Sequence, residues 1–180
     1  MRFIIRPAEL GDMPAITAIY GESVTNGTAS FELTPPSVEE MVRRFAALHD
    51  AGYPRLAAAS EAGVVGYAYA GAYRPRPGYG NTVEDSVYVA PEAQGHGIGR
   101  ALLTALIERC TADGFRQMIA VIGDTGNTAS IRLHRSLGFT PIGTLAAVGW
   151  KHGRWIDSVL MQLGLGAGAT TPPSRVGIGG

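Results

Sequence analysis

The chain has little of what marks several protein classes. Its one cysteine, Cys110, excludes an intramolecular disulfide and a metal site built from cysteines. Its 15 Lys and Arg residues balance 15 Asp and Glu residues, so no basic excess favours nucleic acid or anionic lipid. No apolar run approaches the roughly 20 residues that span a bilayer, and residues 1–7 are too polar for a signal peptide. We therefore expect a cytoplasmic protein without nucleic-acid or membrane partners.

The remaining composition is typical of one globular domain. Hydrophobic residues make up 46% and charged residues 17% of the 180 positions, which allows a substantial core. Hydrophobic periodicity predicts helices beginning near Asp12 and Ser37 and over 98–113 and 127–137, and strands over 3–6, 56–60, 64–73, 82–89, 118–122, 139–148 and 155–163. This order predicts an α+β domain over 1–163, a twisted mixed sheet with helices on both faces in three layers. Residues 164–180 are rich in Gly, Pro and Thr, and we expect a disordered tail.

The most informative segment is the glycine-rich turn 94–100, Gln-Gly-His-Gly-Ile-Gly-Arg, between the apolar run 86–89 and an amphipathic helix. Glycine leaves the backbone accessible, and N–H groups at a helix start favour an anion. No Gly-Lys-Ser/Thr follows, which excludes a Walker A loop, and the G-x-G-x-G spacing without a preceding βαβ unit does not fit a dinucleotide fingerprint. The turn predicts a phosphate or pyrophosphate site, with a glycine-rich turn that binds nothing as the alternative.

The spacing Gln-x-x-Gly-x-Gly resembles the pyrophosphate loop of the GNAT acyl-CoA N-acyltransferases. Further segments in the same order resemble one subfamily, the phosphinothricin N-acetyltransferases, which include methionine sulfoximine/sulfone acetyltransferases. These segments are 28–32, 82–89, 97–100, 130–134, 137–139, 148–151 and 153–157. The resemblance covers about residues 1–163 and implies the GNAT fold, acetyl-CoA-dependent N-acetyltransferase activity, a homodimer and a part in antibiotic or herbicide resistance.

The resemblance also implies where acetyl-CoA, the expected co-substrate, would bind. Strands 82–89 and 118–122 should splay apart, so that the pantetheine arm pairs with an exposed strand edge. The expected cofactor-binding residues are Val87, Tyr88, Val89, Gln94, Gly95, His96, Gly97, Ile98, Gly99, Arg100, Asn127 and Ser130. For Asn127, a plain helix N-cap is the alternative. No spacing of ligands around His96 supports a metal, and we expect none.

Acetyl transfer to an amine requires a neutral amine, a stabilised oxyanion and a proton for the leaving thiolate. In the resembled subfamily the residue at Glu84 is the proposed base; the alternative is an ordinary strand carboxylate. Strand alternation puts Asp85 on the opposite face, which favours a structural role. His134 could protonate the thiolate or relay a proton, with a packing role as the alternative. Cys110 on an amphipathic helix is poorly placed as an acyl carrier, which favours direct attack in a ternary complex.

The acceptor site is less well defined by the sequence. Arg74 and Arg76 are candidates to bind a substrate carboxylate, and Phe31, Glu32 and Tyr79 could line the pocket. The subfamily usually has an arginine where this chain has Gly80. The expected acceptor is a small amino-acid-like amine of the phosphinothricin or methionine sulfoximine/sulfone type. Another amine (a peptide N-terminus, a polyamine or an antibiotic) and a catalytically silent acyl-CoA-binding sensor remain alternatives.

The segment Lys-His-Gly-Arg at 151–154 predicts a hairpin turn flanked by Trp150 and Trp155. By resemblance this hairpin contributes to a homodimer interface or to the edge of the acceptor site. The alternative is a hairpin stabilised by aromatic packing between its strands.

Overall fold

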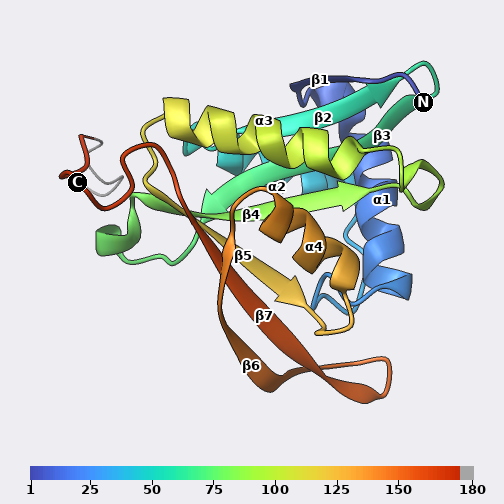
Figure 1. Cartoon of the computed structure of the whole chain (residues 1–180). Helices are drawn as coiled ribbons and strands as arrows, with labels where there is room; N and C mark the ends of the chain where they lie inside the picture. Colours follow the sequence, from blue (N-terminus) through green and yellow to red (C-terminus); the bar gives the residue numbers. More distant parts are fainter. Residues whose placement is uncertain (175–180) are drawn as a thin grey trace.

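A seven-stranded sheet forms the centre of the computed structural model, which describes residues 1–174 (Figure 1). The strands are β1 (Ile4–Pro7), β2 (Arg55–Ser60), β3 (Gly63–Ala72), β4 (Thr82–Val89), β5 (Gln117–Gly123), β6 (Thr140–Lys151) and β7 (Arg154–Gly164). Their order is β1-β2-β3-β4-β5-β7-β6. Only β4 and β5 pair in parallel, while all other neighbours are antiparallel.

In the described residues, four α-helices cover the two faces of the sheet: α1 (Met13–Asn26), α2 (Val38–Asp50), α3 (Ile98–Ala112) and α4 (Thr128–Ser136). Tyr67 of β3 packs against Phe45 of α2, with ring centroids 6.0 Å apart, and α1 lies beside α2 on this face. The preceding residue, Gly66, faces the opposite way, where a Cβ would lie 3.2 Å from Leu102 of α3. α4 lies beside the start of α3 on that second face (Figure 1). The predicted three-layer α+β architecture is therefore confirmed.

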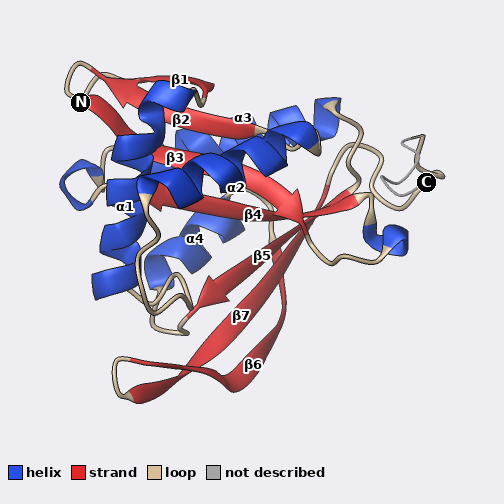
Figure 2. Cartoon of the chain, turned by 180° about the vertical axis from the view of Figure 1, so that it is seen from behind, coloured by secondary structure: helices blue, strands red, loops and turns tan. Residues whose placement is uncertain are grey.

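β4 and β5 pair only over their first four residues, from Thr82–Gln117 to Asp85–Ala120. Beyond that point β4 continues along β3 to Val89, while β5 continues along β7 to Gly123. Figure 2 shows β5, β7 and β6 turning away from the other strands. Among residues 1–174, no strand pairs with the edge of β4 that faces β5 after Asp85, as the expected splay requires.

Local capping agrees with the sequence at α2 and differs at α1. The Ser37 hydroxyl accepts a hydrogen bond from the Glu40 N–H at 3.2 Å, as an N-cap should. Asp12 also precedes its helix, but its carboxylate does not cap it. Instead it accepts two 2.7 Å hydrogen bonds from Arg6 and one from the Glu9 N–H. Asp12 therefore ties β1 to the turn before α1.

The β6–β7 hairpin closes through a two-residue turn. His152 and Gly153 have φ values of 52° and 71°, the left-handed pair that a tight hairpin with right-handed strand twist requires. β6 is longer than the strand predicted over 139–148, because pairing with β7 continues to Lys151 opposite Arg154. This turn confirms the hairpin predicted at 151–154.

The ordered domain extends beyond the boundary expected at residue 163. Leu165 is buried in the core, and the Arg116 guanidinium donates 2.8 Å hydrogen bonds to the Gly168 and Thr171 carbonyls. The predicted disordered tail is thus corrected for 164–174, which packs on the domain; 175–180 lie outside the described residues. Cys110 is fully buried in α3. Within the described part of the chain, none of the helices has the length and apolar character needed to cross a bilayer.

The end of β5 packs closely against the α1–α2 loop, residues 27–36. A Cβ on Gly123 would overlap the Thr28 carbonyl oxygen. We expect Gly123→Ala to lower the free energy of unfolding by about 1–3 kcal/mol in urea denaturation, because backbone must move to accommodate the methyl group.

The matched control is Gly143→Ala in β6, where a Cβ would meet nothing within 4 Å. Its expected effect stays within about 0.5 kcal/mol. Equal losses for the two variants would contradict the close packing at Gly123.

Candidate active site

The separation of β4 and β5 opens a cleft of about 240 Å³ between the two faces of the sheet. Its walls come from α1, the α1–α2 loop, β3, β4, β5 and α4. The lining residues include Tyr20, Ser30, Phe31, Tyr69, Glu84, Asp85, Ser86, Val87, Tyr88, Ile122, Asn127, Ser130 and His134. The structure therefore brings both predicted catalytic residues, Glu84 and His134, to one cleft.

Glu84 lies on the α1/α2 face of β4, opposite Gly71 of β3. Its side chain is partly buried, and no side chain of the described residues forms an ion pair with it. Burial, with a further contribution from the charge of Asp85, raises the pKa of the Glu84 carboxyl to about 7. Such a carboxyl gains and loses a proton near neutral pH, as a general base requires.

Asp85 lies on the other face and is paired with His134. The Asp85 Oδ2 atom is 3.0 Å from His134 Nε2, and the Ser130 carbonyl oxygen is 2.8 Å from His134 Nδ1. Both side chains are buried, and both ring nitrogens face acceptors, so the imidazolium form can donate to each of them. Burial alone lowers the pKa of His134, but the hydrogen bond and charge of Asp85 outweigh it and raise the pKa above its ordinary value.

The contacts of these residues agree with the predicted alternation, since Glu84 and Asp85 face opposite sides of β4. Sequence reasoning missed the partner of Asp85, which lies 49 residues further along the chain. One signal could have suggested this partner, because strand alternation points Asp85 toward the face that α4 covers.

The second carboxylate oxygen of Asp85, Oδ1, is buried without a hydrogen-bond partner among the described residues, and Asp85 lines the cleft.

The glycine-rich turn lies at the N-terminal end of α3. Gly95 and Gly97 have φ values of 78° and 81°, in the left-handed region that favours glycine. His96 is exposed there with Nδ1 2.9 Å from the Gln94 carbonyl, whereas the Ile98 side chain is buried in the core. Ile98, predicted to bind the cofactor, can therefore contribute only its backbone.

A second hollow of about 520 Å³ lies between this turn and the cleft, lined in part by Val87, Tyr88, Val89, Gln94 and Asn127. These are five of the predicted cofactor-binding residues. The Asn127 side chain also caps α4, accepting from the Ser130 N–H at 3.2 Å, which is the alternative role considered for it.

Two other residues predicted to bind the cofactor, Gly99 and Arg100, belong to the first turn of α3. A Cβ on Gly99 would lie 3.5 Å from the Leu133 side chain of α4. Arg100 donates a 2.7 Å hydrogen bond to the Ser136 hydroxyl, so its guanidinium is directed toward α4.

The α1–α2 loop closes one side of the cleft and is tied to the β6–β7 hairpin. The ring of Phe31 lies over Gly149 of β6, where a Cβ would overlap it. Lys151 is buried and its ammonium group donates a 2.7 Å hydrogen bond to the Ser30 carbonyl. Burial lowers the pKa of Lys151, although the negative charge of Glu32 opposes the shift. Phe31, one of the predicted substrate-binding residues, thus lines the cleft, and its ring packs on Gly149.

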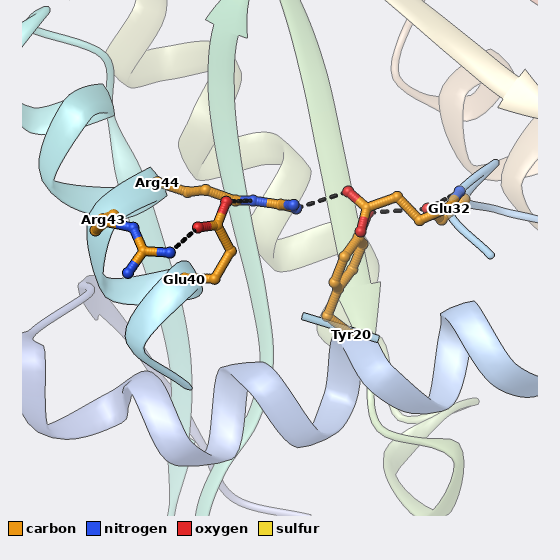
Figure 3. A network of polar contacts seen from close by, with 6 residues as sticks. Tyr20, Glu32, Glu40, Arg43 and Arg44 are labelled. Carbon is orange, nitrogen blue, oxygen red and sulfur yellow. Dashed lines mark hydrogen bonds and ion pairs between the residues drawn. The ribbon is translucent and has the colours of Figure 1, made fainter. Parts of the chain in front are cut away.

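Glu32, also predicted to bind substrate, is held by α2 instead. Its carboxylate accepts a 2.6 Å hydrogen bond from Arg44, which also binds Glu40 at 2.9 Å (Figure 3). These two carboxylates raise the pKa of Arg44, with the Glu40 hydrogen bond contributing most. Glu32 is not among the residues that line the cleft, and its carboxylate forms an ion pair with Arg44, so its contact with the substrate stays a prediction.

Arg74, Arg76 and Tyr79 lie on the exposed loop between β3 and β4, outside the cleft. The Arg74 guanidinium lies over the ring of Tyr73, and the Tyr79 ring contacts the same tyrosine edge-on at 5.7 Å. The structure therefore does not bring these three predicted substrate-binding residues to Glu84. Within residues 1–174, no group of three His, Cys, Asp or Glu side chains is placed to hold a metal ion.

The model of the acetyltransferase (GNAT) family matches residues 21–139, more than half of the chain. The chain belongs to the GNAT acetyltransferase family. The expected GNAT fold is confirmed with it, including the parted strands and the glycine-rich turn before α3.

Three relatives illustrate the similarity. The chain is 54% identical to phosphinothricin N-acetyltransferase from Alcaligenes faecalis, over 94% of this chain and 86% of that protein. It is 46% identical to the L-methionine sulfoximine/L-methionine sulfone acetyltransferase of Pseudomonas aeruginosa, over 93% of this chain and 98% of that protein. The crystal structure of a phosphinothricin acetyltransferase from Sinorhizobium meliloti in complex with acetyl-CoA has a TM-score of 0.94, at 51% identity over 99% of this chain and 96% of that chain.

The Asp85–His134 pair generates a pH-dependent prediction. Because the pKa of His134 is raised in the folded state, the pair stabilises the fold fully below about pH 6.5, and this stabilisation is lost as pH rises through the folded-state pKa. In Asp85→Asn, only the hydrogen bond to the Ser130 carbonyl still opposes the effect of burial, so the pKa of His134 should fall. NMR titration of labelled histidine measures this shift directly.

Thermal unfolding gives the second readout for this pair. The stability difference between the natural protein and Asp85→Asn should be larger at about pH 5.5 than at about pH 9. An unchanged His134 titration, or a stability difference independent of pH, would show that Asp85 does not hold the imidazole protonated.

Proposed function

We propose that this protein transfers an acetyl group from acetyl-CoA to the amine of a small amino-acid-like substrate, of the phosphinothricin or methionine sulfoximine/sulfone type. The transfer is a direct attack in a ternary complex. One observation carries the proposal: a partly buried carboxyl, Glu84, with a pKa of about 7 lies where β4 and β5 part. Family membership and the activities named for the two relatives support the same reaction.

The unpaired edge of β4 and the turn before α3 would hold acetyl-CoA. The pyrophosphate would lie at Gly95, Gly97 and Gly99, where N–H groups at the helix start favour an anion. The pantetheine arm would follow residues 86–89, whose edge toward β5 has no partner strand. Backbone N–H groups on this edge would also stabilise the oxyanion of the tetrahedral intermediate.

Glu84 and His134 would divide the proton transfers. Glu84 accepts a proton from the substrate ammonium group, and the resulting amine attacks the thioester carbonyl. As the tetrahedral intermediate collapses, the C–S bond breaks and the thiolate would accept the proton that His134 Nε2 shares with Asp85, a residue that lines the cleft. The nitrogen loses its second proton as the amide forms, which restores the imidazolium. Asp85 would act as a positioning residue, keeping His134 protonated before this step.

The acceptor would enter beside Phe31, close to Glu84. The carboxylate of an amino-acid substrate would need a cation, and Arg74, Arg76 and Tyr79 could approach only if the loop between β3 and β4 moved toward the cleft. Gly80 supplies no side chain there.

A thiol-release assay with acetyl-CoA tests the function. We expect turnover with methionine sulfone, methionine sulfoximine or phosphinothricin, and Glu84→Gln should lower kcat by about 10²–10⁴-fold. The natural protein should gain activity as pH rises through about 7, and the variant should lack this limb. Glu61→Gln, on the exposed β2–β3 turn, is the matched control.

The stability of the fold should change with pH in the direction opposite to the activity. Because the folded-state pKa of Glu84 is raised, its contribution to stability is lost as pH rises through about 7. Glu84→Gln should therefore be relatively more stable at alkaline than at acid pH.

Two outcomes of the thiol-release assay would contradict the proposed function. Turnover of only polyamines, peptides or aminoglycosides would show that the acceptor is not amino-acid-like. Acetyl-CoA binding without any turnover would favour a sensor.

We also propose that the protein is a homodimer joined through the β6–β7 hairpin. Five large apolar side chains are about half exposed there or more: Ile142, Leu145, Val148, Trp150 and Trp155. Trp150 and Trp155 are paired across the hairpin with ring centroids 5.2 Å apart, so they lie on one face. Large exposed apolar side chains gathered on one hairpin are typical of a protein contact. The cytoplasmic location expected from the sequence stays a prediction.

Light scattering after size exclusion tests the dimer. The natural protein should have twice the mass of the chain, and Trp150→Lys should shift it to the monomer because a charge at the centre of an apolar contact is unpaired. Leu10→Lys, at another exposed leucine remote from the hairpin, should remain dimeric. A monomeric natural protein would refute the proposal.

A further inference from the structure

Lysine occurs once among the 15 Lys and Arg residues of this chain, at position 151 of β6. The Lys151 side chain is buried, and no carboxylate of residues 1–174 forms an ion pair with its ammonium group. Taking a charged group out of water is costly, and a buried ammonium group without a counter-ion recovers little of that cost. No proton transfer of the proposed reaction uses this group, so another role must account for its position.

The partner of Lys151 belongs to the α1–α2 loop. Its Nζ atom donates a 2.7 Å hydrogen bond to the carbonyl of Ser30, 121 residues earlier in the chain. Ser30 is itself buried and lines the cleft. Hydrogen bonds from charged donors are roughly twice as strong as those between neutral groups. The ammonium group therefore fixes one point of the backbone that forms the cleft wall.

Alternation along β6 gives this loop two contacts on one face of the strand. Gly149 and Lys151 are two residues apart and lie on the same face, while Trp150 between them points the other way and is exposed. The Phe31 ring occupies the space that a side chain at Gly149 would fill. The same face of β6 thus carries a place for this ring and a donor for the carbonyl of the preceding residue.

The position of Phe31 depends on the residues beside it in the chain. The ring lines the cleft but is 39% exposed, so packing alone holds it weakly. On one side, the Ser30 hydroxyl lies 2.9 Å from the Tyr20 hydroxyl of α1, and its carbonyl is bound by Lys151. On the other side, Glu32 is bound by Arg44 of α2 (Figure 3). Lys151 supplies the contact that joins this short segment to the β6–β7 hairpin.

The beginning of the loop is held by other contacts. The Gly27 N–H donates to the Ser23 carbonyl at 3.1 Å, and the Gly27 carbonyl lies 3.1 Å from His152 Nε2. Thr28 packs with its carbonyl against Gly123. Gly27 and Thr28 line the second hollow, which also contains the edge of β4 expected to bind acetyl-CoA. Loss of the Lys151 contact should therefore release Phe31 and leave this part of the loop in place.

We propose that Lys151 is a positioning residue for acceptor binding: by holding the Ser30 carbonyl, it keeps Phe31 on Gly149 at the side of the cleft that the acceptor contacts. The inference rests on the proposed function, which places the acceptor beside Phe31 and close to Glu84. Lys151 touches no reacting atom. Its loss should weaken acceptor binding and leave the proton transfers intact.

Lys151→Met tests this role, because methionine keeps an unbranched apolar side chain and lacks the ammonium group. The KM for methionine sulfone should rise about tenfold, since the loop must be ordered when the acceptor binds. The kcat value and the KM for acetyl-CoA should change by less than about twofold. Arg2→Met, which removes an exposed positive charge at the start of the chain, is the matched control and should keep all three values. An equal rise in both KM values would overturn the inference, because it would show a general loosening of the fold.

A double variant tests whether Lys151 acts through Phe31. Phe31→Ala should also raise the KM for methionine sulfone, because it removes the ring that the loop positions. Adding Lys151→Met to Phe31→Ala should then raise this KM by less than about twofold further, since residues that act together are not additive. Independent, fully multiplied effects would show that Lys151 does not position this ring.

Amide hydrogen exchange measures the loop without any turnover. In Lys151→Met, the backbone amides of residues 29–33 should exchange faster than in the natural protein, whereas those of α4 should not change. If Lys151→Met does not fold, the single lysine allows a test on the natural protein. An amine-acylating reagent reaches Lys151 only when the loop lifts, so methionine sulfone should slow acylation at this residue, as peptide mass spectrometry would show. Acylation at an unchanged rate would overturn the inference.

The outcomes separate this inference from the proposed function. If amino acids are acetylated and Lys151→Met has the KM values and loop exchange of Arg2→Met, Lys151 does not position the acceptor site, although the function stands. If the natural protein acetylates no amine, the function fails. Hydrogen exchange then decides the role of Lys151, which requires faster exchange at residues 29–33 in Lys151→Met than in Arg2→Met.

Discussion

Four pairs of residues join β4 to β5, and the rest of the site depends on their pairing ending at Asp85 and Ala120. A parallel pair that continued would cover the edge of β4 and close the sheet. Instead each strand follows its other neighbour, so backbone groups of 86–89 face open space next to the turn at the start of α3. The same separation puts side chains from both faces of the sheet into one cleft, which a continuous sheet would keep apart.

Two adjacent carboxylates at this point have different environments because a strand turns successive side chains to opposite faces. Asp85 meets a histidine from α4 and forms a buried ion pair with it. Glu84 lies opposite a glycine of β3 in a cleft that several aromatic residues line, and burial keeps its carboxyl protonated up to about pH 7. Neighbouring groups whose environments differ in this way are suited to separate acid and base roles.

Periodicity and local signals were enough to predict most of the fold. The strand at 82–89, the Ser37 cap and the tight turn after Lys151 follow from side-chain alternation, a hydroxyl before a helix and a left-handed residue pair. The resemblance also located the cleft. Contacts between distant segments could not be predicted this way, and the ion pair of Glu32 and the burial of Leu165 are two such contacts.

Both contacts depend on tertiary structure. The polarity of Glu32 suggests a substrate contact equally well, and only the position of α2 makes Arg44 its partner. The segment after 163 has the composition of a linker, but one leucine in it fills the core. The Asp85–His134 pair likewise depends on how α4 sits on the sheet, which neither local pattern encodes.

The burial of Cys110 has a practical consequence for following the chemistry. A chromogenic thiol reagent would not reach the buried sulfur of Cys110. The folded protein should therefore add no background to the signal from released CoA. Once α3 detaches from the sheet, each chain exposes one thiol. The rate of labelling without acetyl-CoA would then report how often this helix opens, and the drop in that rate when acetyl-CoA is added would measure how firmly the ligand holds the helix in place.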